Sequence, residues 1–272
     1  MKKIKISVLM PVYNSENYLK DSIESILNQS FTDFEFIIID DASKDKSWEI
    51  IKEYEKKNKN IVALQNILNI GTTKSLNKGL SIAKGKYVVR MDADDWSYPD
   101  RLKKQYNYME KNLDVGVSGG TIEICDKNLT TLNVREYPLT DIAIRKIIFR
   151  FSPFAHSATI WNRKMMKGTG GYNENIPVSQ DCELYFNVGK SSRFGNLRDK
   201  LIKLRMHKDS VSISKNFQQE KYAIFARVKA VMEYRYSIEF GDVLIMIGRV
   251  IAMFLVPKII KFWIFNLLRR KK

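Results

Sequence analysis

The first part of the chain alternates between short runs of consecutive apolar residues and longer segments with a helical period. Apolar runs without polar alternation are typical of strands that are buried on both faces of a sheet. These runs are residues 4–10, 34–39, 61–64 and 86–89. Between them, apolar positions recur every three to four residues, which predicts helices. The predicted helices are residues 16–29, 45–57 and 76–84.

Buried strands that alternate with helices predict an α/β fold, in which right-handed crossovers build a mostly parallel sheet with helices on both faces. Ligands of such sheets bind at the carboxyl ends of the strands. Asn14, Asp41 and the acidic residues 92–95 each follow the end of a predicted strand. We therefore expect three segments that lie far apart in the sequence to meet in one crevice.

Beyond residue 100 the pattern is less regular and predicts shorter elements. They are a helix over 101–111, a glycine-rich strand edge over 115–120, a strand over 155–161, a glycine-rich loop over 168–172 and a helix that opens within 179–186. No internal repeat marks this part of the sequence. The length of 272 residues suits one domain of about 200 residues with an appendage, which we place at 1–215 and 216–272.

The composition is basic, because 46 Lys and Arg stand against 30 Asp and Glu, for a formal net charge of +16. This charge favours an anionic partner such as a nucleic acid, a phosphate-bearing substrate or an anionic membrane, but does not choose among them. Two cysteines and two histidines support neither a disulfide framework nor a structural zinc site. The basic N-terminus lacks a long apolar run, so we expect a cytoplasmic protein.

Three carboxylates stand close together in the sequence Asp92-Ala93-Asp94-Asp95, directly after the strand predicted over 86–89. Carboxylate oxygens are hard ligands that suit Mg²⁺ or Mn²⁺, and such ions commonly bridge protein carboxylates to substrate phosphates. A nucleoside diphosphate is therefore the first ligand to test. The alternative is a solvated acidic cluster that caps the turn before Pro99.

Seven short segments in one order resemble the inverting glycosyltransferases of family 2, over about residues 4–215. The segments are Ser7 to Asn14, Ile39 to Ser43, Asn77 with Gly85-Lys86-Tyr87, Asp92 to Asp95 with Pro99 and Arg101-Leu102, Gly170 to Tyr172, Gln180 to Leu184, and Arg205 to His207. The resemblance, to the bacterial surface-polysaccharide type, implies a GT-A fold. This is a Rossmann-like, mixed and mostly parallel sheet flanked by helices, here with a C-terminal helical extension.

The same resemblance implies a binding site for a nucleotide-sugar, most simply a UDP-sugar. The implied donor-binding residues are Pro11, Tyr13, Asn14, Asp41, Lys74, Asn77, Asp92, Ala93 and Asp94. The implied ligands of Mn²⁺ or Mg²⁺ are Asp92, Asp94, Asp95 and His207. Asp41 would accept a hydrogen bond from uracil, or else act as a charge at a helix N-terminus. Leu76 stands where many relatives carry Arg, which leaves Lys74 as the nearest cation.

Asp181 matches the catalytic base of the family, and the alternative is a helix N-cap. As a base it would take the proton of an acceptor hydroxyl while that oxygen attacks the anomeric carbon, so that the configuration inverts. His207 matches a histidine that reaches the metal or the diphosphate, although a lone histidine here can also be simply exposed. His156 would orient a substrate or Asp181, or else belong to the core.

The composition becomes strongly apolar from residue 243, but Arg249, Lys258 and Lys261 interrupt it before it reaches the length of a spanning helix. Over residues 258–268 the basic and apolar positions separate onto different sectors of a helix. We expect residues 243–272 to bind the anionic inner face of the cytoplasmic membrane, close to a lipid-linked or other saccharide acceptor. The alternative is a helical hairpin packed on the catalytic domain or on a second subunit.

The resemblance implies transfer of a hexosyl or N-acetylhexosaminyl group. Two other functions are alternatives to it. A nucleotidyltransferase that makes nucleotide-sugars would carry a glycine-rich, basic phosphate loop near the N-terminus, but residues 11–16 contain neither glycine nor a basic residue. A nucleic-acid-binding module would interleave basic and aromatic residues in one groove. The densest basic cluster instead follows the apolar tail, so we do not expect a nucleic acid partner.

Overall fold

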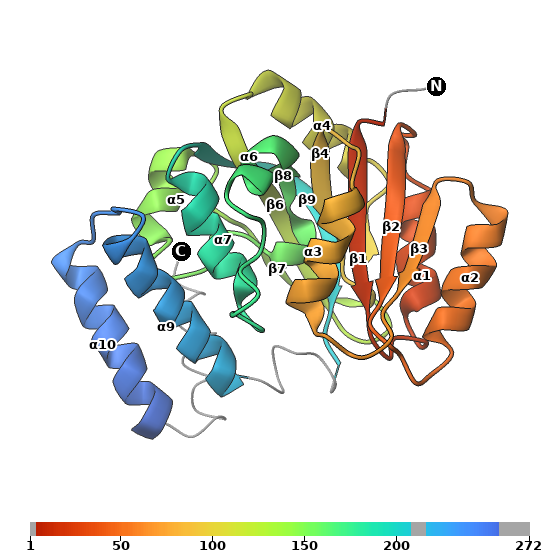
Figure 1. The fold of residues 1–272 in the computed structure, drawn as a ribbon. Coiled ribbons are helices and arrows are strands. Elements are labelled where there is room, and N and C mark those ends of the chain that lie inside the picture. The colour runs from red at the N-terminus through yellow and green to blue at the C-terminus, as the bar shows by residue number, and fades with distance from the viewer. Residues whose placement is uncertain (1–3, 208–215, 256–272) are drawn as a thin grey trace.

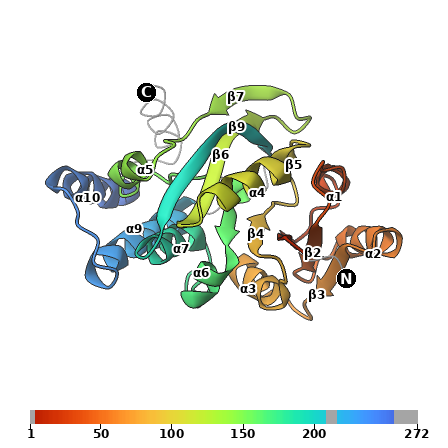
Figure 2. The same ribbon diagram turned by 90° about the horizontal axis from the view of Figure 1, so that it is seen from above.

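One nine-stranded sheet forms the centre of the structure, with helices on both faces (Figures 1 and 2). The computed structural model describes residues 4–207 and 216–255. The strand order is β3-β2-β1-β4-β8-β6-β9-β5, and β7 pairs with β6. The strands are β1 (Ile6–Val12), β2 (Phe34–Asp40), β3 (Ile61–Gln65), β4 (Tyr87–Arg90), β5 (Trp96–Ser97), β6 (Val115–Cys125), β7 (Thr131–Arg135), β8 (Ile160–Asn162) and β9 (Arg193–Arg205).

The helices of the described residues follow the strands in the order expected for an α/β fold. They are α1 (Leu19–Leu27), α2 (Ser47–Lys57), α3 (Thr72–Ile82), α4 (Arg101–Lys111), α5 (Asp141–Ile147), α6 (Arg163–Gly168), α7 (Gln180–Gly189), α9 (Asn216–Met232) and α10 (Phe240–Leu255). A 3₁₀ turn covers His156–Ala158.

Strands β1 to β4 form a parallel half of the sheet, in which β1 pairs with β2 and β4, and β2 pairs with β3. Alternate residues of β1 belong to two cores. Val8 and Met10 pack with α1, α2 and α4, whereas Leu9 packs with α3 and α7. Figure 2 shows these helices on opposite faces. Because the four strands are parallel, all of them end at the same edge of the sheet.

The other half of the sheet is mixed. β8 is antiparallel to β4 and β6, β5 is antiparallel to β9, and a long parallel pairing joins β6 to β9. The glycine-rich segment predicted as a strand edge lies inside the sheet, as part of β6 between β8 and β9. A Cβ atom at Gly120 would lie 2.7 Å from Leu201 Cδ1, so glycine leaves room there for a neighbouring side chain.

The prediction of a mixed, mostly parallel α/β sheet is confirmed, and the four N-terminal strands and the helix over 101–111 lie where they were predicted. Other boundaries were wrong. The helix expected over 76–84 runs from Thr72 to Ile82, and the helix expected over 16–29 is only Leu19–Leu27. Of the strand expected over 155–161, only the end is extended, because a 3₁₀ turn precedes β8. β5, β7, β9, α5 and α6 were not predicted.

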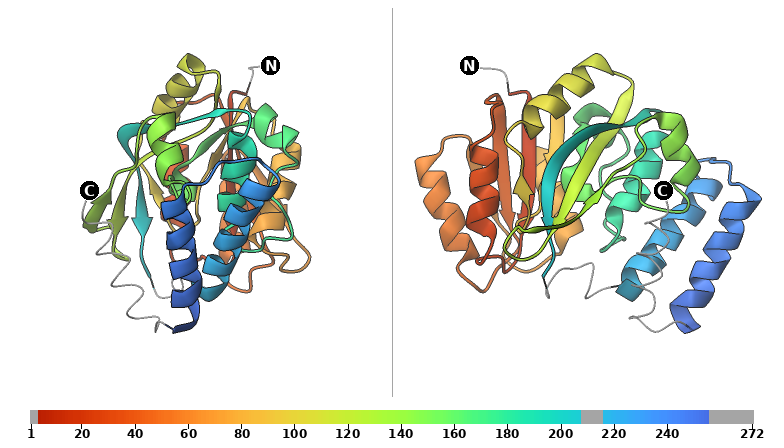
Figure 3. Two further views of the ribbon diagram at one scale, coloured as in Figure 1. Left: turned by 90° about the vertical axis from the view of Figure 1, so that its left-hand side faces the viewer. Right: turned by 180° about the vertical axis from the view of Figure 1, so that it is seen from behind.

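α9 packs beside α7, and α10 packs on α9, at one end of the molecule (Figure 3). Ala226 and Ala230 of α9 are fully buried in the core that also contains residues of α7. α10 contacts α9 and is fixed by Arg150, which pairs with Asp242 and, at 3.4 Å, with Glu239. α9 therefore packs on the core, and the part of the 243–272 tail within α10 packs on α9. The division at residue 215 and the membrane contact stay predictions.

No helix within residues 4–207 or 216–255 has the length and apolar character needed to cross a bilayer. The basic and apolar helix predicted over residues 258–268 lies outside the described residues.

Candidate active site

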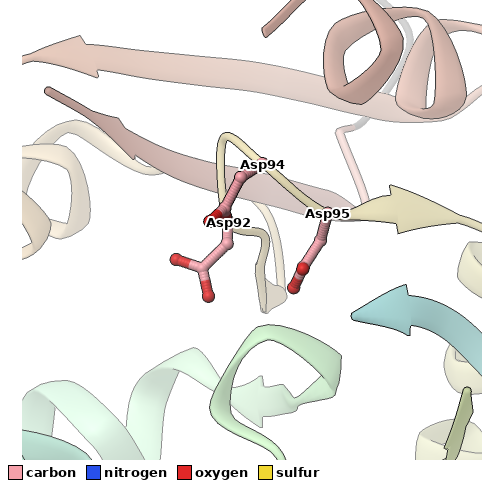
Figure 4. A group of neighbouring side chains, drawn as sticks. All are labelled: Asp92, Asp94 and Asp95. Atoms are coloured by element: carbon pink, nitrogen blue, oxygen red, sulfur yellow. The ribbon is translucent and has the colours of Figure 1, made fainter. Parts of the chain in front are cut away.

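The acidic cluster lies on the connection between β4 and β5, at the edge where the parallel strands end (Figure 4). Carboxylate oxygens of Asp92, Asp94 and Asp95 all lie within 4.8 Å of one another. The side chains of Asp92 and Asp94 are partly exposed, whereas that of Asp95 is buried. Such a group of oxygens has the spacing needed to hold one divalent cation.

Each carboxylate of the cluster has a separate partner. Asp92 forms an ion pair with Arg90 at the end of β4. His207 Nε2 lies 2.8 Å from Asp94 Oδ2, which places the fourth predicted metal ligand at the cluster. The backbone N–H of Arg205 donates to Asp95 Oδ1 at 3.0 Å. The end of β9 therefore completes the site from a segment more than 100 residues away.

The electrostatics of the cluster favour a bound cation. Burial raises the pKa of Asp95 well above its ordinary value, and the charges of Asp94 and Asp92 raise it further. Burial also raises the pKa of Asp92, although the charge of Arg90 acts in the opposite direction. A divalent cation would relieve this repulsion, and carboxylate and imidazole ligands suit Mn²⁺ or Mg²⁺. The residues present therefore fit the predicted metal.

The backbone that carries the cluster is held from both sides. The Ser22 hydroxyl in α1 lies 2.8 Å from the carbonyl oxygen of Ala93 and 2.6 Å from that of Asp95. The guanidinium of Arg101 is fully buried and donates from Nη2 to the carbonyls of Arg90 and Ser157. Burial lowers the pKa of Arg101 to about 9, so this group still carries its charge at neutral pH.

Asp41 organises the loop between β3 and α3. Its buried carboxylate accepts hydrogen bonds from the backbone N–H groups of Ile70 at 2.9 Å and Gly71 at 2.8 Å. It also accepts one from Asn66 Nδ2 at 2.8 Å. Gly71 is the N-cap of α3, so Asp41 lies at the N-terminus of that helix and not at the start of α2, which begins at Ser47. The helix N-terminal alternative therefore holds for α3. The contact of Asp41 with uracil stays a prediction.

The loops after β1 and β2 are joined through Asn14. Its backbone N–H donates to Ser43 Oγ at 2.9 Å, and its side-chain oxygen accepts from the backbone N–H of Lys44 at 2.8 Å. Asn14 has a positive φ of 48°, a conformation that asparagine tolerates better than most residues. Pro11 lies within β1, and the Tyr13 side chain is 46% exposed, so its ring is accessible to a ligand.

Lys74 is exposed beside a cavity of about 320 Å³. The cavity is lined by Ile70, Gly71, Thr73, Lys74, Glu174, Asn175, Pro177 and Tyr222. It therefore adjoins the loop that Asp41 holds, but neither the acidic cluster nor Asp181 lines it. The structure places Lys74 at a ligand-sized space, and its contact with a donor stays a prediction.

Asn77 fixes the loop that contains the two adjacent glycines. Its Nδ2 donates to the carbonyl of Tyr172 at 2.8 Å, and its Oδ1 accepts from the N–H of Tyr172 at 3.0 Å. Gly170 and Gly171 have φ values of 89° and 78°, which glycine adopts without strain. Both amide groups of Asn77 are thus engaged within the protein, and the predicted contact with a nucleotide would require them to exchange partners.

Asp181 lies in the first turn of α7, whose N-cap is Ser179 and not Asp181. Burial raises the pKa of Asp181. The nearby polar groups of Cys182 and Tyr185 and the charge of Arg90 act to lower it. Arg90 is the residue that pairs with Asp92, so one guanidinium links the acidic cluster to Asp181. The two predicted functional groups therefore share one electrostatic environment.

His156 and Tyr172 lie in the same environment. His156 Nε2 is 2.8 Å from the Tyr172 hydroxyl, and burial together with the charge of Arg90 lowers the pKa of His156 well below its ordinary value. The pKa of Tyr172 is raised by burial and by the charges of Asp181 and Asp92, against the influence of Arg90. His156 is therefore a neutral side chain that positions Tyr172.

Several residues that build the site were not assigned roles from the sequence. They are Ser22, Asn66, Arg90, Tyr172, Tyr185 and Arg205. For two of them, the sequence contained a feature that could have indicated a role. Arg90 is a charge at the end of an otherwise apolar strand, and Arg205 lies two residues before His207 in a segment already noted.

Comparisons with known proteins agree with this geometry. The model of the family described as "Glycosyl transferase family 2" matches residues 7–169. An uncharacterized glycosyltransferase of Methanocaldococcus jannaschii is 35% identical over 231 residues, which cover 83% of this chain and 79% of the relative. The O-antigen biosynthesis glycosyltransferase WbnJ of Escherichia coli is 33% identical over 218 residues, which cover 77% and 82%.

Two solved structures share the fold. Residues 1–349 of S. aureus TarS in complex with UDP superpose with a TM-score of 0.67 at 22% identity, over 92% of this chain and 72% of that chain. The mannosyltransferase PcManGT from Pyrobaculum calidifontis, in complex with GDP-Man and Mn²⁺, gives a TM-score of 0.67 at 15% identity, over 93% and 70%. The predicted GT-A architecture is confirmed.

The acidic cluster should bind Mn²⁺ in solution. We expect Asp94→Asn to weaken Mn²⁺ binding by at least about tenfold, because it removes a charged ligand that also contacts His207. Asp114→Asn, at an exposed carboxylate just before β6, should leave binding unchanged. The Mn²⁺ affinity of both variants can be measured by electron paramagnetic resonance of the free ion. Equal affinity of Asp94→Asn and the unaltered chain would contradict the assignment of Asp94 as a metal ligand.

Proposed function

The chain belongs to glycosyl transferase family 2, and on this premise we propose that it transfers a hexosyl or N-acetylhexosaminyl group from a UDP-sugar to an acceptor hydroxyl with inversion. The observation that carries the proposal is the shared environment of the acidic cluster and Asp181, which Arg90 links. Family membership removes the nucleotidyltransferase and the nucleic-acid-binding module as alternatives.

The donor would lie along the edge where the parallel strands end. UDP and UDP-GlcNAc are bound in structures of S. aureus TarS, which supports a uridine nucleotide as the first choice. Tyr13 offers an exposed ring for stacking on a base, and the loop held by Asp41 offers polar groups beside it. Lys74 offers a positive charge next to the same loop, suited to an anionic ligand.

The metal would be held by Asp92, Asp94, Asp95 and His207, whose donor atoms fit Mn²⁺ or Mg²⁺. When bound, it would stabilise the negative charge that develops on the departing diphosphate. Mn²⁺ accompanies GDP-Man in the structure of PcManGT, which supports a metal of this kind. Ser22 and Arg101 would keep the ligand-bearing backbone in place while the donor is bound.

Asp181 would act as the general base. Its ionised carboxylate takes the proton of the acceptor hydroxyl as that oxygen forms a bond to the anomeric carbon, and the bond from this carbon to the diphosphate oxygen breaks on the opposite face. The single displacement inverts the configuration and needs no covalent intermediate. Because burial raises the pKa of Asp181, its ionised carboxylate is a stronger base than that of an ordinary aspartate.

Asp181→Asn should lower kcat by about 10³-fold, because it removes the base, while the KM for the donor stays within about threefold. Since burial raises the pKa of Asp181, the unaltered enzyme should lose kcat/KM as the pH falls through a value above the ordinary aspartate pKa of about 4. The measurement is UDP release with Mn²⁺ from UDP-glucose, UDP-galactose, UDP-GlcNAc and UDP-GalNAc, with a saccharide acceptor.

Asp114→Asn again serves as the matched control and should retain full turnover. Retention of more than a tenth of kcat by Asp181→Asn would sink the assignment of the base. If the enzyme released UDP from none of the four donors, that result would instead contradict the proposed donor class.

We further propose that the C-terminal helices attach the enzyme to the inner face of the cytoplasmic membrane, where a lipid-linked acceptor would lie. α10 carries an apolar stripe with a spacing of three to four residues, which places its members on one face of the helix. The stripe is Phe240, Leu244, Ile247 and Ile251, whose exposed fractions lie between 50% and 77%. The six basic residues among 258–272 follow the same helix in the sequence. Apolar side chains next to a basic segment match an anionic lipid surface.

The full chain should co-sediment with vesicles of phosphatidylglycerol and phosphatidylcholine, and less so as salt is raised. Leu244→Asp with Ile251→Asp should reduce the bound fraction several-fold, because charge on the stripe opposes insertion. Ile142→Asp, at an exposed apolar residue of α5, is the control and should bind as the unaltered chain does. A stable dimer that the α10 variants dissociate, without vesicle binding, would favour the second-subunit alternative.

A further inference from the structure

α7, the helix that carries Asp181, is held along its length by α9 and the residues that follow it (Figure 1). At its start, the Ser179 hydroxyl donates to the carbonyl of Gln219 at 3.1 Å. At its end, the Tyr236 hydroxyl donates to the carbonyl of Phe186 at 3.1 Å. Between these points, α7 and α9 share the apolar core that contains Ala226 and Ala230.

The strongest contact between the two helices is a buried ion pair. The Glu183 side chain is only 1% exposed, and its Oε1 lies 3.1 Å from Lys229 Nζ. The Tyr234 hydroxyl donates a hydrogen bond to the same oxygen. A buried carboxylate is costly unless it is paired, so loss of Lys229 would leave an uncompensated charge inside the protein. Among the described contacts, Glu183 therefore relies on partners from the C-terminal segment.

The geometry of a helix connects this ion pair to the candidate base. Glu183 follows Asp181 by two residues, and residues at this spacing point about 200° apart around a helix axis. Asp181, on which the charge of Arg90 acts, and Glu183, which contacts Lys229 of α9, therefore lie on opposite sides of α7. The contacts of Glu183 with Lys229 and Tyr234 therefore fix the rotation of α7 about its own axis, and with it the direction of the Asp181 side chain.

We infer that Lys229 and Tyr234 are positioning residues, which hold α7 in the rotation that turns Asp181 toward the acidic cluster. The inference rests on the proposed role of Asp181 as the base. The inference gives α9 a part in the reaction. The family model would not indicate this part, because it matches only residues 7–169 and α9 lies beyond them. A displacement of a reacting group by about 1 Å can cost about 10²-fold in rate, so a modest rotation of α7 would be measurable.

The test uses the full chain and UDP release from the four UDP-sugars named above. We expect Lys229→Met to lower kcat at least about tenfold, while the KM for the donor and the affinity for Mn²⁺ stay within about twofold. Lys229→Arg, which keeps the positive charge, should retain kcat within about threefold. Lys221→Met, at an exposed lysine of the same helix, is the matched control and should leave kcat unchanged.

A double variant separates positioning from a general loss of stability. Lys229→Met with Glu183→Gln removes both charges, so no uncompensated carboxylate remains, and kcat should recover at least threefold relative to Lys229→Met alone. A double variant that is as slow as the single one, or a single variant that melts earlier but keeps its kcat and KM, would overturn the inference.

Hydrogen exchange gives a readout that does not depend on turnover. Lys229→Met should speed amide exchange in residues 180–189 of α7, while exchange in residues 72–82 of α3 stays unchanged. Unaltered exchange in α7 would overturn the inference even if no donor is turned over. Failure of the unaltered chain to release UDP from any donor, with faster exchange in the variant, would instead count against the proposed function alone.

Discussion

The crowding of three carboxylates at the end of β4 is the constraint on which the rest of the site depends. Like charges at this spacing repel, and burial of Asp95 makes the repulsion worse. The protein compensates with Arg90 beside Asp92 and with the N–H of Arg205 beside Asp95. Helix α1, helix α4 and strand β9 all bond to this short connection, so much of the fold serves to hold it in one shape.

The N-terminal half of the fold could be predicted because its signals are local. Strands buried on both faces appear as uninterrupted apolar runs, and a charged cluster directly after such a run must lie at the carboxyl end of a strand. The second half gave weaker signals, because β7 is mostly exposed and β9 mixes buried and exposed residues. Its long pairing with β6 depends on contacts between residues about 80 positions apart, which periodicity alone does not reveal.

The candidate site shows the same division. Asp92, Asp94, Asp95 and His207 were predicted from short motifs, and the structure brings His207 to Asp94. Two roles could be identified only from the three-dimensional contacts. Arg90 acts on both Asp92 and Asp181, and Asn77 supports the loop at Tyr172. α9 was predicted to lie in the appendage 216–272. Its buried positions include the small residues Ala226 and Ala230, which in the sequence do not mark a core-facing side of the helix. Only the three-dimensional structure shows that α9 packs against α7 and shares its apolar core.

The central claim is that the acidic cluster and Asp181 face one space that holds an activated sugar. A crystal structure of the full chain with Mn²⁺ and UDP, with the metal located by its anomalous scattering, measures this directly. We predict a metal peak between Asp94 and His207 that also contacts the diphosphate, with the Asp181 carboxylate open to the same space. A metal or UDP bound elsewhere, or an Asp181 side chain separated from the diphosphate by protein, would contradict the account.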